Sequence, residues 1–386
     1  MTSVNEIDQF LLTAVERQDV PGVVGIVANK GQVLYHQAFG KLNTASRLRS
    51  PAGAMFRIMS MTKPITSVVA MTFREAGQLD LDDPVSRFLP RFKNPQVVAY
   101  FNETNSTYTT RPAEGEIAIR HLLNHTAGFG YAFSNHTARL LEQKADKPID
   151  QLPLLHDPGS RWTYGPNTRI LGRVLERISG VSLEDLFRER VFKPLQMPDT
   201  SFYLAAEDQS RRVACHQRRG NSLAEIPLPQ PFEPVTRGDG GLLSTATDYI
   251  RFLRMLLNGG NLDGSRVLSQ DSIELMTQNQ IGELLVELEP AAIPETARSF
   301  PAGAGVDKFG LGFQITGLDT GNSIDQGKYH RFQGSYSWSG LMNTHFWVDP
   351  VKGIAAVFLT QLLPFYDPRC LRVYRGFEDL VYRHLV

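Results

Sequence analysis

Strand-forming sequence lies at both ends of this chain, while the long stretch between the two ends has mostly helical periodicity. Residues 23–28 and 33–36 are rich in β-branched and aromatic side chains and flank a glycine-containing turn, which predicts a hairpin. Residues 336–348 and 354–360 predict a second hairpin near the C-terminus. We therefore expect an α/β (α+β) fold, in which helices flank an antiparallel sheet built from both termini and a mostly helical domain is inserted between them.

The first clear helical pattern begins at about Ser60 and continues to Glu75, where Gly77 follows as a stop signal. Pro64 constrains its start, because proline is tolerated only near the beginning of a helix. A helix that begins at about Ser60 points its backbone N–H groups and the positive end of its dipole towards that serine. Further helices are expected at 167–178, 182–191, 247–257 and 367–385.

These elements divide the 386 residues into two expected domains. The α/β sheet domain is discontinuous and comprises residues 1–85 and 231–386. The helical domain comprises residues 86–230. An active site is expected in the cleft between them.

The charge and composition of the chain argue against several kinds of partner. Forty basic and forty acidic residues cancel, so no overall field attracts nucleic acid or an anionic membrane. No apolar run approaches the ~20 residues of a membrane span. Cys215 and Cys370 are the only cysteines and lack a zinc-type spacing, which favours two free thiols in a reducing compartment. A cytoplasmic location is expected, because the N-terminal segment has no features of a signal peptide.

Ser60 and Lys63 are the residues that most clearly suggest chemistry. They form the only S-x-x-K sequence in the chain, and on a helix residues three apart lie on one face. The lysine amine is then placed to take the proton that a serine loses when it attacks a carbonyl. Serine and lysine are common residues, so the pattern needs support from elsewhere in the sequence.

Tyr164 is a second candidate, because it lies on a turn just before the helix that Asn167 opens. On a turn, a side chain can project into a cleft. Tyrosine and lysine both have reference pKa values of about 10, and a charged neighbour and partial burial can bring one of them near neutrality. Tyr164 would then take part in proton transfer. The alternative is a structural role, in which the ring covers the core and the hydroxyl group bonds to the turn.

Trp338, Ser339 and Gly340 form a third candidate, on the expected strand at 336–348. A strand edge presents backbone N–H groups in a fixed direction. A developing oxyanion requires such a group, paired with the N–H of the nucleophile. Trp338 would add an apolar wall, although a tryptophan buried between strand and helix explains the same residue.

These three segments, in this order, resemble the motifs of the serine β-lactamase and penicillin-binding-protein superfamily. The match is closest to its class C-like carboxylesterases, called family VIII. Connecting sequence also matches, at 56–59, 121–128, 239–246 and 346–350.

The resemblance implies a β-lactamase-like fold and a serine carboxylesterase that hydrolyses short- to medium-chain esters through an acyl-enzyme. Ser60 would be the nucleophile, with Lys63 and Tyr164 as the proton-transfer pair. The backbone N–H groups of Ser60 and Leu341 would form the oxyanion hole. Which of Lys63 and Tyr164 is the base in the resting enzyme is left open, because the two groups titrate as a pair. The residues implied for substrate binding are Trp338, Ser339, Gly340 and Asn167.

Two departures from the superfamily pattern bear on the substrate. The third motif of its β-lactamases and peptidases is Lys-Thr-Gly, whose lysine binds a carboxylate, whereas this chain has Trp338. Pro166 replaces the asparagine expected two residues after the tyrosine, and Asn167 comes one place late. Both departures favour a neutral, apolar acyl substrate over a β-lactam.

Other functions remain open from sequence alone. The same acyl-enzyme could pass its acyl group to an alcohol or amine, as in an acyltransferase. A β-lactamase or D-amino-acid peptidase is disfavoured by Trp338, and a non-enzymatic binding relative by the presence of Ser60, Lys63 and Tyr164 together. We expect a small-molecule ester as partner, no nucleic acid or membrane, and no metal or cofactor. Specificity is expected to depend on loops within 128–160 and 275–310, while the oligomeric state is not predicted.

Overall fold

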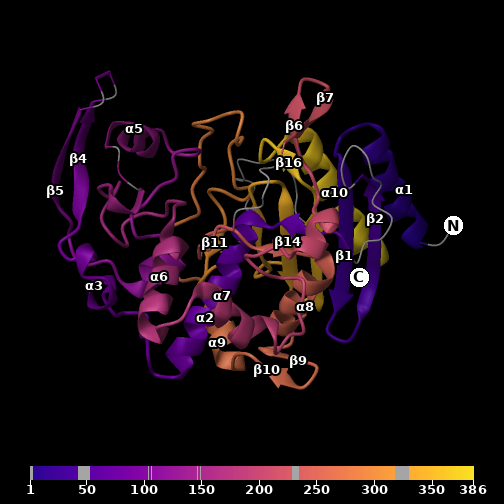
Figure 1. Ribbon diagram of the computed structural model, residues 1–386, viewed down its shortest axis with the longest axis horizontal. Helices are drawn as coiled ribbons and strands as arrows, with labels where there is room; N and C mark the ends of the chain where they lie inside the picture. Colours follow the sequence, from indigo (N-terminus) through magenta and orange to yellow (C-terminus); the bar gives the residue numbers. More distant parts are fainter. Residues whose placement is uncertain are drawn as a thin grey trace.

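A seven-stranded antiparallel sheet, in the order β11-β12-β13-β14-β15-β1-β2, runs through the protein (Figure 1). The computed structural model describes residues 3–41, 53–102, 104–105, 107–145, 147, 149–227, 234–317 and 330–386. The strands are β1 (Gly22–Asn29), β2 (Val33–Gly40), β11 (Lys308–Phe309), β12 (Gln314–Ile315), β13 (Tyr336–Gly340), β14 (Thr344–Asp349) and β15 (Ile354–Leu359). Because β1 pairs with β15, strands from the two ends of the chain lie side by side in this sheet. The expected sheet built from both termini is confirmed.

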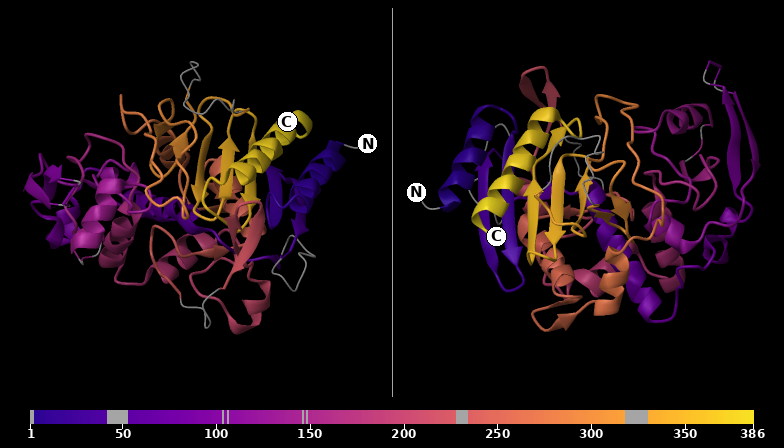
Figure 2. Two further views of the ribbon diagram at one scale, coloured as in Figure 1. Left: turned by 90° about the horizontal axis from the view of Figure 1, so that it is seen from above. Right: turned by 180° about the vertical axis from the view of Figure 1, so that it is seen from behind.

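Helices cover both faces of this sheet, so its central strands are buried almost throughout. They are α1 (Ser3–Glu16) and α10 (Pro368–His384) on one face and α8 (Ala246–Leu257) on the other (Figure 2). Side chains alternate along a strand, and β1 follows this rule. Val23 and Val27 pack with α1 and α10, whereas Val24 and Ile26 belong to the larger core that contains α8.

α2 (Thr62–Glu75) lies between the sheet and the helical region of the chain. Every residue from Thr62 to Phe73 is buried, which is typical of a helix surrounded by protein. It shares one core with the sheet and contacts α6 (Asn167–Ser179) and α7 (Leu183–Phe187). The N-terminal end of α2, which closely follows Ser60 in sequence, therefore lies between the sheet and the helical region of the chain. The remaining helices are α3 (Val85–Phe88), α4 (Ile119–Leu123), α5 (His136–Ala145) and α9 (Gln270–Thr277).

The helical region also contains strands that the sequence pattern did not predict. β4 (Gln96–Asn102) pairs with β5 (Thr107–Pro112), and β6 (Cys215–Arg219) pairs with β7 (Ser222–Ile226). Residues 96–102 are partly exposed and lack a clear alternation of buried and exposed positions. Such a hairpin therefore gives a weak period-two pattern.

The single strand expected at 336–348 is wrong in one respect, because a turn at 341–343 divides it into β13 and β14. Asn343 has a φ of 58°, a left-handed conformation that asparagine tolerates better than most residues. Its Nδ2 donates to the carbonyl groups of Leu362 and Pro364 at 2.7 and 2.9 Å. Tertiary contacts therefore fix a turn that contains neither glycine nor proline.

None of the helices in the described ranges combines the length and apolar character that crossing a membrane requires. Cys215 and Cys370 are buried free thiols. The domain boundaries given above stay predictions.

Candidate active site

Ser60 lies in a short 3₁₀ turn, Met59–Met61, that leads directly into α2. The α-helix begins at Thr62, two residues later than expected, and Pro64 falls in its first turn, where its missing N–H costs nothing. Met59 has a φ of 48°, a strained conformation for a non-glycine residue that is often found beside functional groups. Lys63 still reaches the serine, and its Nζ lies 3.0 Å from Ser60 Oγ.

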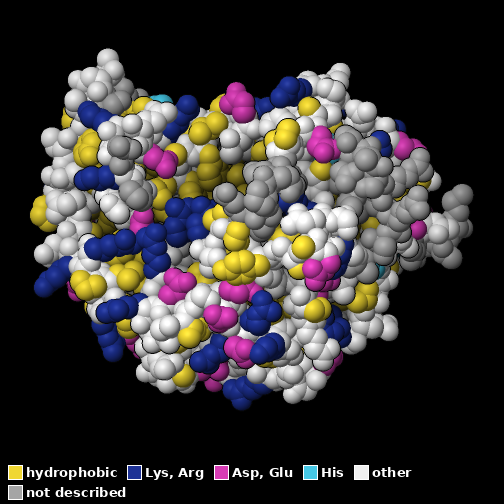
Figure 3. All heavy atoms as spheres, viewed as in Figure 1, with side chains coloured by type: hydrophobic (Ala, Val, Ile, Leu, Met, Phe, Trp, Pro, Cys, Tyr) yellow, Lys and Arg dark blue, Asp and Glu magenta, His cyan; other side chains and the backbone are white. Residues whose placement is uncertain are grey.

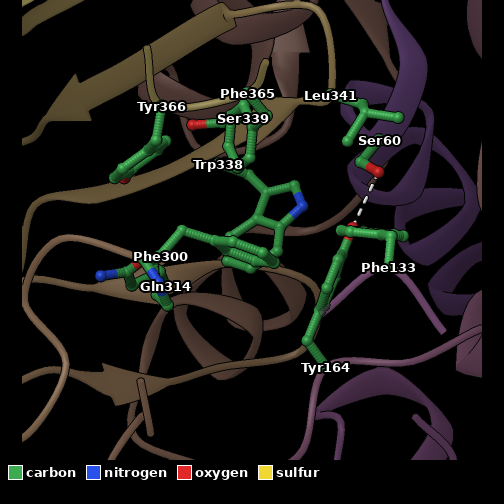
Figure 4. A pocket seen from close by; sticks show the side chains of 11 residues that line it. Ser60, Phe133, Tyr164, Phe300, Gln314, Trp338, Ser339, Leu341, Phe365 and Tyr366 are labelled. Carbon is green, nitrogen blue, oxygen red and sulfur yellow. Dashed lines mark hydrogen bonds between the residues drawn. The ribbon is translucent and has the colours of Figure 1, made fainter. Parts of the chain in front are cut away.

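Tyr164 approaches Ser60 from the turn before α6. Its hydroxyl group donates to Ser60 Oγ at 2.7 Å (Figure 4). The turn before α6 carries Tyr164, and the backbone N–H of that residue donates to Glu289 Oε1 at 2.7 Å. The structure therefore brings Ser60, Lys63 and Tyr164 together from segments more than 100 residues apart.

The Lys63 amine is fully enclosed by protein. Nζ lies 2.9 Å from the carbonyl oxygen of Asp239, 3.2 Å from the hydroxyl group of Tyr131 and 3.0 Å from Ser60 Oγ. Burial lowers the pKa of Lys63 to about 7, Asp239 opposes this shift, and Arg169 and Arg237 add to it. At neutral pH a large fraction of Lys63 is therefore an uncharged amine.

Tyr131 and Asp239 determine how this amine is oriented. The Tyr131 hydroxyl group donates to Asp239 Oδ2 at 2.6 Å, so its oxygen accepts from Lys63. The Asp239 carbonyl oxygen is also an acceptor. A neutral amine has two N–H donors and one lone pair, and when both donors are engaged here the lone pair is left for the Ser60 hydroxyl group.

The carboxyl group of Asp239, which accepts the hydrogen bond from Tyr131, stays ionised. Burial alone would raise the pKa of its carboxyl group, but Lys63, Arg169 and Arg237 hold that pKa below its ordinary value. Arg169, on α6, bonds to the carboxylate at 3.0 Å. The segment that contains Asp239 therefore borders the site and also supplies a buried charge.

Tyr164 differs from Lys63 in its protonation. Burial raises the pKa of the Tyr164 hydroxyl group above its ordinary value, although Ser60 and Trp338 act in the opposite direction. The indole nitrogen of Trp338 faces the Ser60–Tyr164 pair in Figure 4. The hydroxyl group is therefore protonated at neutral pH, and Lys63 is the stronger candidate for the resting base.

The end of β13 lies directly against the backbone before Ser60. A Cβ atom on Gly340 would come within 2.3 Å of the Ile58 carbonyl oxygen, so only glycine allows this approach. Leu341 follows in the turn and lines the same pocket as Ser60. This contact holds the Gly340–Leu341 turn close to the segment that carries Ser60.

An apolar pocket opens beside Ser60 and Tyr164 (Figure 4). Its cavity volume is about 20 Å³, which is close to the volume for one or two waters. Aromatic side chains from both expected specificity loops contribute, Phe133 from 128–160 and Phe300 from 275–310. The other lining residues are Pro301, Gln314, Trp338, Ser339, Leu341, Phe365 and Tyr366.

Ser339 is held by a buried histidine on the neighbouring strand. Ser339 and His345 are cross-strand partners, and Ser339 Oγ lies 2.8 Å from His345 Nδ1. Burial lowers the pKa of His345 to about 3, so the ring is neutral. The hydroxyl group of Ser339 is thereby fixed at the pocket wall.

The sequence model of the beta-lactamase family matches residues 7–379, almost the whole chain. The chain belongs to the beta-lactamase family. Its resemblance to the class C-like branch is supported by the two relatives and the solved structure that follow.

Relatives within this beta-lactamase family include acyltransferases and esterases. The chain is 29% identical over 393 residues to a monacolin J acid methylbutanoyltransferase of Aspergillus terreus, covering 96% of this chain and 93% of the relative. It is 27% identical over 403 residues to a lovastatin esterase of Penicillium rubens, covering 97% and 98%. A mutant of the simvastatin synthase of Aspergillus terreus has a similar structure, with a TM-score of 0.81 at 26% identity and coverage of 99% and 97%. The protein is thus a member of a beta-lactamase-fold family of serine hydrolases and acyltransferases.

Asn167 does not occupy the substrate-binding position inferred from the beta-lactamase pattern. Its side chain is fully buried, and its amide donates to His125 Nδ1 at 2.7 Å. It is absent from the pocket lining, because Pro166 caps α6 and turns the next residue into the core. The predicted contact between Asn167 and substrate is therefore not supported.

Sequence patterns missed three residues that support this beta-lactamase-fold site. Tyr131 and Asp239 contact Lys63, and Glu289 binds the Tyr164 backbone. Asp239 and Tyr131 lie within segments singled out above, but neither has a local pattern that marks it. In the described part of the chain, no cluster of three or more His, Cys, Asp or Glu residues could hold a metal ion.

Proposed function

We propose that this protein is a serine carboxylesterase, which hydrolyses short- to medium-chain esters through an acyl-enzyme on Ser60. One observation carries the proposal. The buried amine of Lys63 and the hydroxyl group of Tyr164 both lie within 3.0 Å of Ser60 Oγ. This is the arrangement of a nucleophile with a base on one side and an acid on the other.

Acylation begins when neutral Lys63 takes the proton of the Ser60 hydroxyl group. Ser60 Oγ attacks the ester carbonyl carbon, and the backbone N–H groups of Ser60 and Leu341 stabilise the negative charge on the carbonyl oxygen. The bond between carbonyl carbon and alcohol oxygen then breaks. Tyr164 gives its proton to the leaving alcohol, and the proton held by Lys63 restores the neutral hydroxyl group of Tyr164.

Deacylation uses the same groups in reverse. A water molecule takes the place of the alcohol and loses a proton to the Lys63–Tyr164 pair as it attacks the acyl carbon. The bond to Ser60 Oγ breaks, and Ser60 recovers its proton. No group outside the described site is needed for this cycle.

The pocket favours small apolar groups on the substrate. Its walls are mainly aromatic, and the space within them is narrow. Trp338 occupies the position at which related enzymes carry a lysine, so this wall offers no charge to the carboxylate of a β-lactam. A cytoplasmic location is part of the proposal, and the two buried free thiols support it.

Acyl transfer to an alcohol is the second candidate. The relatives named above include a methylbutanoyltransferase at an identity close to that of the esterase. An apolar pocket that favours an alcohol over water would direct the acyl-enzyme to transfer. A competing acceptor alcohol, added to the assay below, would measure this partition.

The test is turnover of p-nitrophenyl butyrate and a chromogenic cephalosporin by the wild type and by Ser60→Ala. We expect ester cleavage that Ser60→Ala lowers by at least about a thousandfold, with little β-lactam turnover. Mass spectrometry of the quenched reaction should find a butyryl group on the peptide that contains Ser60. Ester cleavage that persists within tenfold in Ser60→Ala would exclude the proposed nucleophile.

A further inference from the structure

We propose that Arg237 binds a carboxylate group of the ester substrate, outside the apolar pocket and beside the Met59–Ser60 backbone. The inference rests on the proposed function, because it assigns part of the substrate. It places an anionic group where neither the pocket lining nor the third motif would suggest one.

The position of Arg237 is fixed by the turn that holds Asp239. A Cβ atom on Gly240 would lie 3.6 Å from Arg237 Nη2 and 3.8 Å from the Met59 carbonyl oxygen. The guanidinium group and the backbone next to the nucleophile therefore flank the same point.

Asp239 does not need Arg237 as a partner. Its carboxylate already accepts from Tyr131 at 2.6 Å and from Arg169 at 3.0 Å. Arg237 Nε lies 3.4 Å from Oδ1, in ionic contact, and that nitrogen has no hydrogen-bond partner within the described structure. This buried Nε faces Asp239, whereas the two terminal nitrogens of Arg237 make no hydrogen bond within the described residues, and a carboxylate can accept from two guanidinium donors at once.

The guanidinium group is also accessible. The Arg237 side chain is 40% exposed, compared with 20% for Arg169 and 2% for Asp239. Arginine therefore faces solvent here, while the carboxylate that balances it lies beneath. An incoming anion would meet positive charge first.

Positive charge continues from Arg237 along the helical region. Arg169 and Arg173 lie one turn apart on α6, and Arg173 and Arg91 both pair with the buried Asp150. Among these described residues, four arginines face two buried carboxylates. Figure 3 shows Lys and Arg side chains gathered beside an apolar hollow, over the region of α6. The cleft thus has an aromatic side and a cationic side.

The positive charge of Arg237 lies in an electrostatically unfavourable position, which supports a functional role for this residue. It stands close enough to Lys63 to disfavour the ammonium form, and it shares a single carboxylate with Arg169. A purely structural guanidinium group would be better placed with a carboxylate of its own, as Arg120 is with Asp82. A substrate carboxylate would complete the partners of Arg237.

Two matched ester pairs test the inference. p-Nitrophenyl hydrogen adipate and its primary amide analogue place the charge on the acyl side, whereas 4-carboxyphenyl butyrate and 4-carbamoylphenyl butyrate place it on the alcohol side. The ratio of kcat/KM within each pair is measured for the wild type, Arg237→Gln and the control Arg120→Gln. Using ratios removes any effect of Arg237→Gln on the chemistry itself, and Ser60→Ala supplies the background.

We expect the wild type to prefer the carboxylate ester in one pair by about tenfold, a preference typical of a charge-assisted contact. Arg237→Gln should reduce that ratio to below about twofold, Arg120→Gln should preserve it, and added salt should weaken it in the wild type. A wild type without preference in either pair, or a preference that survives Arg237→Gln or high salt, overturns the inference. Ser60-dependent cleavage of none of the four esters would instead contradict the proposed function.

Discussion

The Tyr131 hydroxyl group donates to the Asp239 carboxylate at 2.6 Å, directly behind the Lys63 amine, although 108 residues separate the two in sequence. This hydrogen bond fixes the Tyr131 oxygen as an acceptor. The positions of the protons on Lys63, and therefore the direction of its lone pair, depend on two residues that contact Lys63 but lie 68 and 176 residues away from it in sequence. Tyr131 is therefore a positioning residue.

Replacing Tyr131 with phenylalanine should lower kcat by about ten- to a hundredfold while KM changes less, because a buried donor and a buried carboxylate both lose a partner. Steady-state kinetics on p-nitrophenyl butyrate measure the effect. Tyr35→Phe is the matched control, since its hydroxyl group also bonds to an aspartate, Asp8, at 2.9 Å, on the far side of the sheet. Equal losses in the two variants would argue against a special role for Tyr131.

The pH profile of kcat/KM should rise through about pH 7, because the Lys63 amine is active only after it loses its proton and burial brings its pKa to about 7. Activity is then present above this pH and lost below it. Arg237→Gln removes a positive neighbour that lowers the pKa of Lys63, so its profile should move to higher pH. A profile that is flat between pH 6 and 8 would contradict the assignment of Lys63 as the base.

Lys63→Ala and Tyr164→Phe should each reduce kcat by several orders of magnitude, on the order of 10³ or more, because each removes one half of a proton-transfer pair. The kcat of the double variant should be at most about tenfold lower than that of the less active single variant. Single-turnover measurements would separate acylation from deacylation. If the losses in activation free energy of the two single variants add up in the double variant, the two groups act independently.

Phe300→Ala should shift substrate preference towards longer chains, because Phe300 forms one wall of a narrow pocket. We expect the ratio of kcat/KM for octanoate over butyrate esters to rise by about tenfold. Phe101→Ala, on the β4–β5 hairpin and outside this pocket, serves as the control. An unchanged ratio would mean that the chain does not enter this space.

Glu289→Gln should make stability less dependent on pH. Burial raises the pKa of Glu289 to about 7, so the folded state retains a proton that the unfolded chain loses near pH 4.5. Stability from this group is therefore present at low pH and declines as the pH rises towards 7. Glutamine keeps the acceptor for the Tyr164 N–H but cannot ionise, so its Tm should exceed that of the wild type by a few degrees at pH 8 and by less at pH 5. A constant difference, measured by thermal unfolding across this range, would contradict the buried-acid interpretation.

Local geometry explains why much of this fold and site was predictable. The pairing of Ser60 with Lys63 requires only that residues three apart share a helix face, so a pattern of four letters was sufficient. The strands β1 and β15 are continuous apolar runs, which buried strands must be.

Residues that act through tertiary contacts could not be predicted in the same way. Glu289 matters because a loop returns to the Tyr164 backbone 125 residues away, and no local pattern encodes that approach. Asn167 illustrates the opposite error, since its motif position suggested substrate contact while the start of α6 directs it to His125. The turn after β13 was missed because Asn343 takes the left-handed conformation usually supplied by glycine.

The pairing of β1 with β15 also sets an order of events during synthesis. The serine and lysine emerge from the ribosome early, but the strand that completes the central sheet and the wall that carries Trp338 emerge among the last residues. At typical elongation rates the N-terminal hairpin waits on the order of tens of seconds for its partner. The nascent chain therefore contains Ser60 long before the active site can form. A chain that terminates before residues 354–359 leaves one edge of β1 unpaired, and an unpaired strand edge promotes aggregation.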